Sequence, residues 1–129
     1  MFEKLEIFRM AHALATHAGA RQSVVAQNMA NADTPDYRAR DVTPFKEIIE
    51  SGDSGFVPRV TRPGHLHAAA LPFDLGIAEV RDVETDPNGN SVSLETEMMK
   101  AVDVKREHDR ALAVYKSSLG VLRSALGRR

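Results

Sequence analysis

The most persistent pattern of hydrophobic positions lies toward the two ends of the chain. Near the N-terminus, small and aliphatic residues recur at spacings of three, four or seven, at Ile7, Ala11, Leu14, Ala18, Val25 and Met29. These spacings place side chains on one face of an α-helix. Pro35 disfavours the helical conformation for the residue before it. The pattern therefore predicts one helix from about Phe2 to Asn31, within an N-terminal helical segment of residues 1–33.

A longer apolar pattern begins at Leu94 and advances by four and three residues in turn. It runs through Leu94, Met98, Ala101, Lys105, His108, Leu112, Tyr115, Leu119, Leu122 and Leu126. This heptad spacing indicates coiled-coil packing. A helix over 94–126 would be about 50 Å long at ~1.5 Å per residue, with Ser93 as its N-cap. A chain this small cannot cover such a helix, so we expect it to pack on the N-terminal helix and on neighbouring copies.

The segment between the helices, residues 34–93, shows weaker patterns. Thr43 is a suitable N-cap and Pro44 a suitable first residue for a short helix, whose apolar face would hold Phe45, Ile48 and Ile49. Residues 51–55 close that helix with Ser, Gly and Asp. Short extended pieces are expected at 56–60 and 76–83, and Asn88-Gly89 predicts a tight turn. The predicted fold is mainly α, with long N- and C-terminal helices (the latter in 94–129) packed as a coiled-coil-like pair around a small irregular or β-containing insert.

Charge and composition exclude several classes of protein. Lys and Arg number 17 and Asp and Glu 18, and no run of like charge is long enough to be a nucleic-acid-binding arm. The absence of cysteine excludes disulfides, a thiol nucleophile and thiolate metal sites. No stretch approaches the ~20 apolar residues of a membrane span. The first residues carry charges within the apolar pattern, so no cleavable signal peptide is expected.

Three candidate sites have an ordinary interpretation that we favour. His65 and His67 can lie on one face of a strand, but no third metal ligand accompanies them at a convincing spacing. Asp86, Asn88, Asn90 and Glu97 match ligand positions of a calcium loop, yet Ser91 replaces the required glycine, and a turn before a capped helix explains the same residues. His108 is a buried pH switch or, as we favour, a polar residue that fixes helix register. We therefore predict no metal, no cofactor and no catalytic site.

A dense motif follows the N-terminal helix at Asn28–Arg38. Its distinctive residues are Asn28, Ala30, Asn31, Thr34, Pro35, Tyr37 and Arg38. The ordinary interpretation is a helix C-terminus with common turn residues. We expect Asn31 and Asp33 to satisfy the freed backbone groups, and Tyr37 to anchor the exit of the chain by packing against a neighbour.

This motif resembles the axial proteins of the bacterial flagellum, in which an N-terminal helix ends in a pattern like Asn-x-Ala-Asn-x-x-Thr-Pro-Gly-Tyr. Further stretches are similar to the proximal-rod members of that family: Arg38–Asp41 with Phe45, Thr61 with His65-Leu66, and Asn88–Met98. Asp36 replaces the usual Gly, so we expect a loop that does not depend on a glycine-only conformation there. Ser93 stands where Asp is common, and His108 where Tyr is.

The resemblance implies a structural subunit of the flagellar basal body, in the proximal rod that transmits torque from motor to hook. Such subunits leave through the flagellum-specific type III export channel without cleavage and assemble helically in the periplasm. The implied partners are other copies, the rod proteins FlgC and FlgF, the rod-junction protein FliE, the export apparatus and the inner-membrane ring, with no nucleic acid and no small-molecule substrate. The motif would direct assembly together with an assembly seam at Leu14, Ala18, Val25, Leu94, Met98, Leu112, Tyr115, Leu119, Leu122 and Leu126.

Two other classes of function remain open from the residues alone. One is a soluble helical adaptor that dimerises through its C-terminal coiled coil. The other is a small enzyme or metal protein that uses His65, His67 or the loop at Asp86. A stable, fully helical dimer of the isolated chain would favour the first, and a stoichiometric bound metal would favour the second.

Overall fold

The computed structural model describes residues 2–50, 75–81 and 83–127. Along the chain the elements are α1 (Phe2–Ala30), β1 (Arg40–Asp41), α2 (Phe45–Glu50), β2 (Ala78–Glu79) and α3 (Leu94–Ala125). The candidate residues His65 and His67, and the extended pieces expected at 56–60, lie outside the described residues. No described helix has the length and apolar character needed to cross a membrane.

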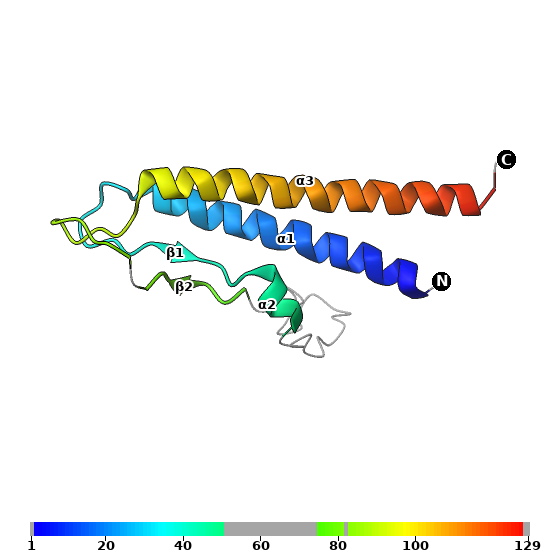
Figure 1. The fold of residues 1–129 in the computed structure, drawn as a ribbon, viewed down its shortest axis with the longest axis horizontal. Coiled ribbons are helices and arrows are strands. Elements are labelled where there is room, and N and C mark those ends of the chain that lie inside the picture. The colour runs from blue at the N-terminus through cyan, green and yellow to red at the C-terminus, as the bar shows by residue number, and fades with distance from the viewer. Residues whose placement is uncertain (1, 51–74, 82, 128–129) are drawn as a thin grey trace, which may run out of the picture.

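Two long helices, α1 and α3, run side by side in opposite directions and form most of the structure (Figure 1). The helix α1 ends one residue before the expected Asn31, and α3 ends one residue before the expected Leu126. The predicted N-cap of α3 is confirmed, because the Ser93 hydroxyl accepts a hydrogen bond from the Thr96 amide at 3.4 Å. The mainly α fold, with paired terminal helices and a small strand-containing middle, is therefore confirmed.

Small side chains allow the two helices to approach closely. Ala11, Ala18 and Val25 lie seven residues apart on α1 and are buried, as are Val104 and Ala111 on α3. Residues of this size let helix backbones pack at short interaxial distance. Near the start of α1, the ring of Phe8 meets the ring of Tyr115 from α3 edge to face, with centroids 5.2 Å apart.

The stripe of α3 that packs against α1 differs from the predicted seam by part of a turn. The fully buried positions on α3 are Glu97, Val104 and Ala111. The larger apolar residues of the predicted seam remain exposed in the single chain, at Leu94, Met98, Leu112, Tyr115 and Leu126. On α1, by contrast, Ala18 and Val25 are buried and Leu14 is half-buried. The α3 part of the seam is thus open to another molecule, and its burial in an assembly stays a prediction.

The elements β1, α2 and β2 of the middle segment lie along one side of the helix pair (Figure 1). The strands β1 and β2 pair antiparallel, with Arg40 opposite Glu79 and Asp41 opposite Ala78. The prediction that Thr43 caps α2 is wrong. Its hydroxyl donates instead to the Gly76 carbonyl at 3.1 Å, which ties the start of α2 to the segment leading into β2. The first turn of α2 uses the Pro44 carbonyl as acceptor for the amides of Glu47 and Ile48.

Two positions in the helix pair allow a test of the packing between the helices. Ala111 of α3 is 1% exposed, whereas a Cβ added at Gly19 of α1 would meet no atom within 4 Å. We expect Ala111→Leu to lower the free energy of unfolding by about 1–3 kcal/mol, because extra methylenes do not fit a close-packed interface. Gly19→Ala should raise it by roughly 0.5–1 kcal/mol, because alanine loses less backbone entropy in a helix. Urea unfolding followed by far-UV circular dichroism measures both, and an unaffected Ala111→Leu variant would contradict the packing described.

Candidate functional site

The structure brings together two motifs that are far apart in sequence. The segment that follows α1 lies against the segment that precedes α3, at one end of the helix pair (Figure 1). Backbone hydrogen bonds join them, from the Asp36 amide to the Asn88 carbonyl at 3.0 Å and from the Ser91 amide to the Tyr37 carbonyl at 3.1 Å. The Ser91 hydroxyl also accepts from the Ala39 amide at 2.9 Å. The Asn28–Arg38 motif and the Asn88–Met98 stretch therefore form one site.

Asn28 is the buried centre of this site. Its side-chain amide nitrogen donates to the Arg40 carbonyl at 2.7 Å and to Glu97 Oε2 at 3.0 Å. Its amide oxygen accepts from the Arg40 amide at 3.1 Å and from the Tyr37 hydroxyl at 3.4 Å. The side chain is fully buried, and both of its donors and its acceptor are used. One residue thus holds α1, the start of β1 and the first turn of α3 together.

Glu97 extends this centre into a chain of charges between the helices and β1. The carboxylate is 2% exposed, and Glu97 Oε1 accepts from Lys100 Nζ at 2.8 Å. Lys100 Nζ also lies 3.5 Å from Asp41 Oδ2, and Asp41 receives a bidentate contact from Arg21 at 3.0 and 3.2 Å. A buried carboxylate without such partners would cost several kcal/mol. The contacts with Asn28 and Lys100 therefore offset the cost of burying the Glu97 side chain.

The same contacts set the ionisation of Asp41 and Arg21. Burial by itself would raise the pKa of Asp41. Hydrogen bonds from Arg21 and from the Val42 amide, together with the charges of Arg21 and Lys100, outweigh burial and hold the pKa of Asp41 below its ordinary value. The hydrogen bond to Asp41 raises the pKa of Arg21 despite partial burial.

Asn90 satisfies the carbonyl groups left free at the end of α1. Its side-chain nitrogen donates to the carbonyls of Asn31, Ala32 and Thr34 at 2.8–2.9 Å. Its side-chain oxygen accepts from the Val92 amide at 2.7 Å, and the residue is 1% exposed. Sequence reasoning missed this role, because the partner lies in a distant segment. The repeated Asn in Asn88-Gly89-Asn90 was the available signal.

The predicted roles of Asn31 and Asp33 have different outcomes. The Asn31 side chain donates to the Gln27 carbonyl at 2.7 Å, a group that also accepts from the Asn31 amide at 3.1 Å, so the role of Asn31 in ending the helix stays a prediction. The prediction for Asp33 is wrong: a helix C-terminus leaves carbonyl acceptors free, and a carboxylate has no proton to donate to them. Asp33 is exposed, and Asn90 supplies the donors instead.

The loop after α1 requires a left-handed backbone at Asp36, where φ is +58°. The expectation that this loop does not depend on a glycine-only conformation is confirmed, because an Asp adopts the left-handed region here. Asp tolerates the left-handed region better than most residues, so it can replace the family's Gly at modest cost. Gly89 lies against it with φ of +82°, and a Cβ there would collide with the Asp36 side chain.

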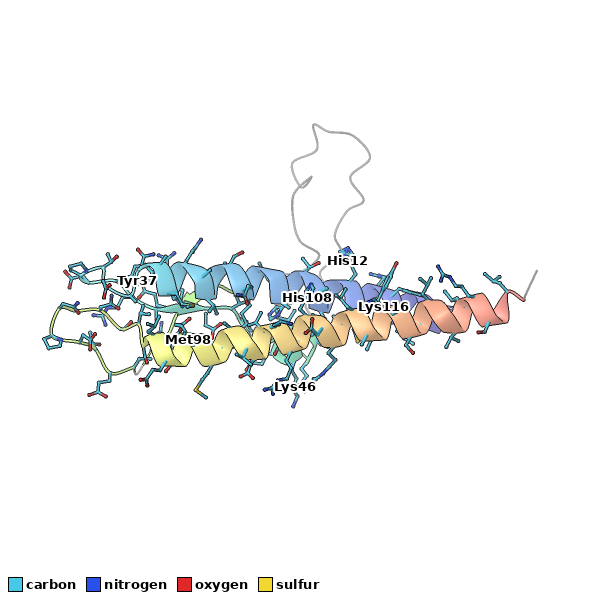
Figure 2. The ribbon with its side chains drawn as sticks, turned by 90° about the horizontal axis from the view of Figure 1, so that it is seen from above. His12, Tyr37, Lys46, Met98, His108 and Lys116 are labelled. Atoms are coloured by element: carbon cyan, nitrogen blue, oxygen red, sulfur yellow. The ribbon has the colours of Figure 1, made fainter. Side chains whose placement is uncertain are left out.

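The remaining motif residues lie around this centre. Tyr37 is half-buried, and its hydroxyl donates to the Asn28 amide oxygen. Ala30, Thr34 and Pro35 are exposed. Thr34 donates to Asn31 Oδ1 at 3.2 Å, and exposed Arg38 reaches the Thr85 hydroxyl at 3.5 Å. Figure 2 shows Tyr37 and Met98 near the same end of the pair. A contact of Tyr37 with a neighbouring molecule stays a prediction.

Residues considered as metal ligands have other roles in the structure. The turn predicted at Asn88-Gly89 is confirmed, with the Gly89 amide bonded to the Asp86 carbonyl at 2.9 Å. Asn90 and Glu97, two of the four calcium-loop positions, are held by the hydrogen bonds described above. Within residues 2–50, 75–81 and 83–127, no group of three or more His, Asp or Glu is arranged to hold a metal ion.

His108 lies half-buried between the helices (Figure 2). It lines a cavity of about 550 Å³ together with Ala18, Gly19, Gln22, Ala101, Val102, Val104 and Lys105.

The terminal helix pair, closed by the Asn28–Arg38 motif, has the architecture expected of a flagellar axial protein. No family model matches the chain. It is 31% identical over 118 residues to the flagellar basal body rod protein FlgB of Agrobacterium fabrum. The matched residues make up 89% of this chain and 88% of that relative. FlgB proteins of Cereibacter sphaeroides and Escherichia coli K12 are 32% and 30% identical, over 82% and 81% of this chain and 82% and 83% of their own lengths. The chain belongs to the FlgB family of flagellar basal body rod proteins.

The cap formed by Asn90 can be tested by truncation. Asn90→Ala should lower the free energy of unfolding by about 1–3 kcal/mol, because three carbonyls at the end of α1 lose the donor that the buried Asn90 side chain supplies. Glu84→Ala is a matched control in the same segment, since Glu84 is exposed, and it should change the stability by less than about 0.5 kcal/mol. Equal effects in urea unfolding would contradict the role assigned to Asn90.

The lowered pKa of Asp41 predicts acid sensitivity. A depressed carboxyl pKa stabilises the folded state at pH above the unfolded pKa of about 3.9. That stabilisation is lost as the pH falls through the lower folded pKa. The difference in unfolding free energy between the wild type and Asp41→Asn should therefore be constant near neutral pH and shrink below about pH 4. A difference that stays constant into strong acid would show that Asp41 is not held ionised by Arg21 and Lys100.

Proposed function

We propose that the chain is a structural subunit of the flagellar rod that assembles helically through α1 and α3 and transmits torque from motor to hook. Membership of the FlgB family supports a place in the rod of the basal body. The architecture suits a mechanical role, because two long helices joined by a buried polar network form a stiff rod-shaped body.

The observation that carries this proposal is the exposed apolar stripe on α3. Met98 is 55% exposed, Leu94 48%, Tyr115 44% and Leu112 39%. Large apolar residues exposed along one face of a helix are typical of a surface that another protein covers. A subunit that offers this stripe to a different surface of the next copy makes a contact that does not close on itself, and such contacts build helical assemblies.

The proposal divides the chain into three working parts. Residues 1–33 and 94–129 are the axial helices, and 34–93 hold the loop, the short helix and the β-containing insert. The assembly motif ends α1 and turns the chain away from the helix pair at Asn28, Ala30, Asn31, Thr34, Pro35, Tyr37 and Arg38. The assembly seam brings copies together through the exposed residues of α3, with Leu14, Ala18 and Val25 holding α1 in place beneath it.

The proposed partners follow from the rod assignment. They are other copies of the chain, the rod proteins FlgC and FlgF, the junction protein FliE, the export apparatus and the inner-membrane ring. The chain would reach the periplasmic part of the basal body through the flagellar export channel without cleavage. The role is structural, and it requires no cofactor, small-molecule substrate or nucleic acid.

Two neighbouring methionines on α3 give the test. Met98 belongs to the seam and Met99 does not, yet both are more than half exposed in the single chain. Met98→Asp should leave the helicity of the purified chain unchanged and abolish swimming, because an assembled rod would bury its carboxylate without a partner at a cost of several kcal/mol. Met99→Asp should swim. The measurement is soft-agar motility of a strain whose own copy has been replaced.

Equal motility of the two variants would contradict the proposal that copies assemble through the α3 seam. A soluble adaptor predicts a different result: the purified chain would be a stable dimer by analytical ultracentrifugation, and Met98→Asp would dissociate it.

A further inference from the structure

Asn88 and Gly89 form a pair of residues that can react with each other. The chain has four asparagines, at positions 28, 31, 88 and 90, and only Asn88 precedes a glycine. In such a pair the glycine nitrogen can attack the asparagine side-chain carbon, because glycine has no side chain to hinder the approach. Asn88 is exposed, so water reaches the pair. The pair lies in the 86–90 turn, at the end of the molecule where α1 ends and α3 begins (Figure 1).

In the folded chain, hydrogen bonds engage both reacting groups. The Gly89 amide donates to the Asp86 carbonyl at 2.9 Å, so its proton is held within the turn. Asn88 Oδ1 accepts from the Asn90 amide at 3.0 Å, which fixes the direction of the Asn88 side chain. The Asp86 amide closes the turn by donating to the Asn90 carbonyl at 2.8 Å. The reaction therefore requires the 86–90 turn to open.

Contacts with the segment after α1 hold this turn closed. The Asn88 carbonyl accepts from the Asp36 amide at 3.0 Å. The Asn90 side chain is 1% exposed and donates to three carbonyls in residues 31–34 at 2.8–2.9 Å. Local opening costs more free energy where buried hydrogen bonds have to break. Opening of the 86–90 turn is thus coupled to release of the segment after α1.

We propose that Asn88 is a deamidation site that the fold keeps closed and that reacts when the 86–90 turn opens. The Gly89 nitrogen forms a bond with Asn88 Cγ, and the bond from Cγ to Nδ2 breaks. Nδ2 leaves as ammonia, with the proton that the Gly89 nitrogen loses. Water then opens the resulting cyclic imide at one of its two carbonyl carbons. One opening gives aspartate, and the other gives isoaspartate, in which the main chain runs through the former side-chain carbon. This inference is independent of the rod assignment.

The isoaspartate product changes the main chain that the site depends on. It adds a methylene group to the main chain at position 88 and turns the former backbone carbonyl into a free carboxylate. The acceptor for the Asp36 amide and the spacing between Gly89 and Asp86 are then altered. Deamidation to aspartate adds the same negative charge but leaves the main chain unchanged. Isoaspartate should therefore weaken the junction between the segments after α1 and before α3.

The rate of deamidation tests the protection. The purified chain is kept at one mildly alkaline pH, either folded or unfolded in guanidinium chloride, and peptide mass spectrometry follows the loss of Asn88. We expect deamidation to be at least about tenfold slower in the folded chain, a ratio that corresponds to ~1.4 kcal/mol for opening the turn. Equal rates in the two states would overturn the proposal.

Asn90→Ala tests the contacts that hold the turn closed and leaves the reacting pair unaltered. In a variant shown to be helical by circular dichroism, deamidation should be several-fold faster than in the wild type. The control is Glu84→Ala, at an exposed position in the same segment, and it should keep the wild-type rate. In guanidinium chloride all three chains should react alike. A wild-type rate in folded Asn90→Ala would overturn the coupling to the segment after α1.

Asn88→Asp separates the added charge from the added methylene group. A chain deamidated in guanidinium chloride is refolded, its isoaspartyl form is isolated by chromatography, and its urea unfolding is compared with that of Asn88→Asp. We expect the isoaspartyl form to unfold at a lower urea concentration than the variant. Equal midpoints would overturn the claim that the altered main chain weakens the site. None of these results bears on the rod assignment, which the motility of the Met98 and Met99 variants tests.

Discussion

The buried hydrogen bond between the Asn28 amide and the Glu97 carboxylate fixes how the two long helices meet. The surrounding contacts are made by small residues such as Ala11, Ala18 and Ala111, which repeat every heptad and would fit almost as well if one helix slipped by seven residues. A slipped pair would bury an unpaired amide and an unpaired carboxylate, at a cost of several kcal/mol. Apolar packing alone would specify the register of α1 against α3 only weakly. The polar pair therefore fixes that register, as single buried polar residues do in coiled coils.

This register determines what the molecule presents to others. With Glu97, Val104 and Ala111 turned toward α1, the larger apolar residues of α3 are left on an adjacent face. The buried polar network spans α1, β1 and α3, so the open face is held on a single body rather than on a loose helix. The proposed role in the rod would use this combination, because a subunit that transmits torque has to pass force between its neighbours without deforming.

The sequence predicted the elements well and their contacts less well. Heptad spacing, Pro35 and Ser93 located both helices to within a residue, because these signals act locally along the chain. The stripe of α3 facing α1 was misjudged, since hydrophobicity favoured Met98 and Leu112 over buried Glu97, whose partner Asn28 lies on the other helix. Asn90 was missed for the same reason, because the carbonyls that it binds lie in the segment after α1.

The central claim is that the exposed stripe of α3 is covered in the assembled rod. The chain has no cysteine, so Leu112→Cys creates a single thiol at a seam position that is 39% exposed in the isolated molecule. The rate of maleimide labelling can then be compared between the purified chain and isolated basal bodies. The account predicts rapid labelling of the chain and at least about a tenfold slower rate in the rod, which corresponds to ~1.4 kcal/mol of protection. Equal rates in the two states would contradict it.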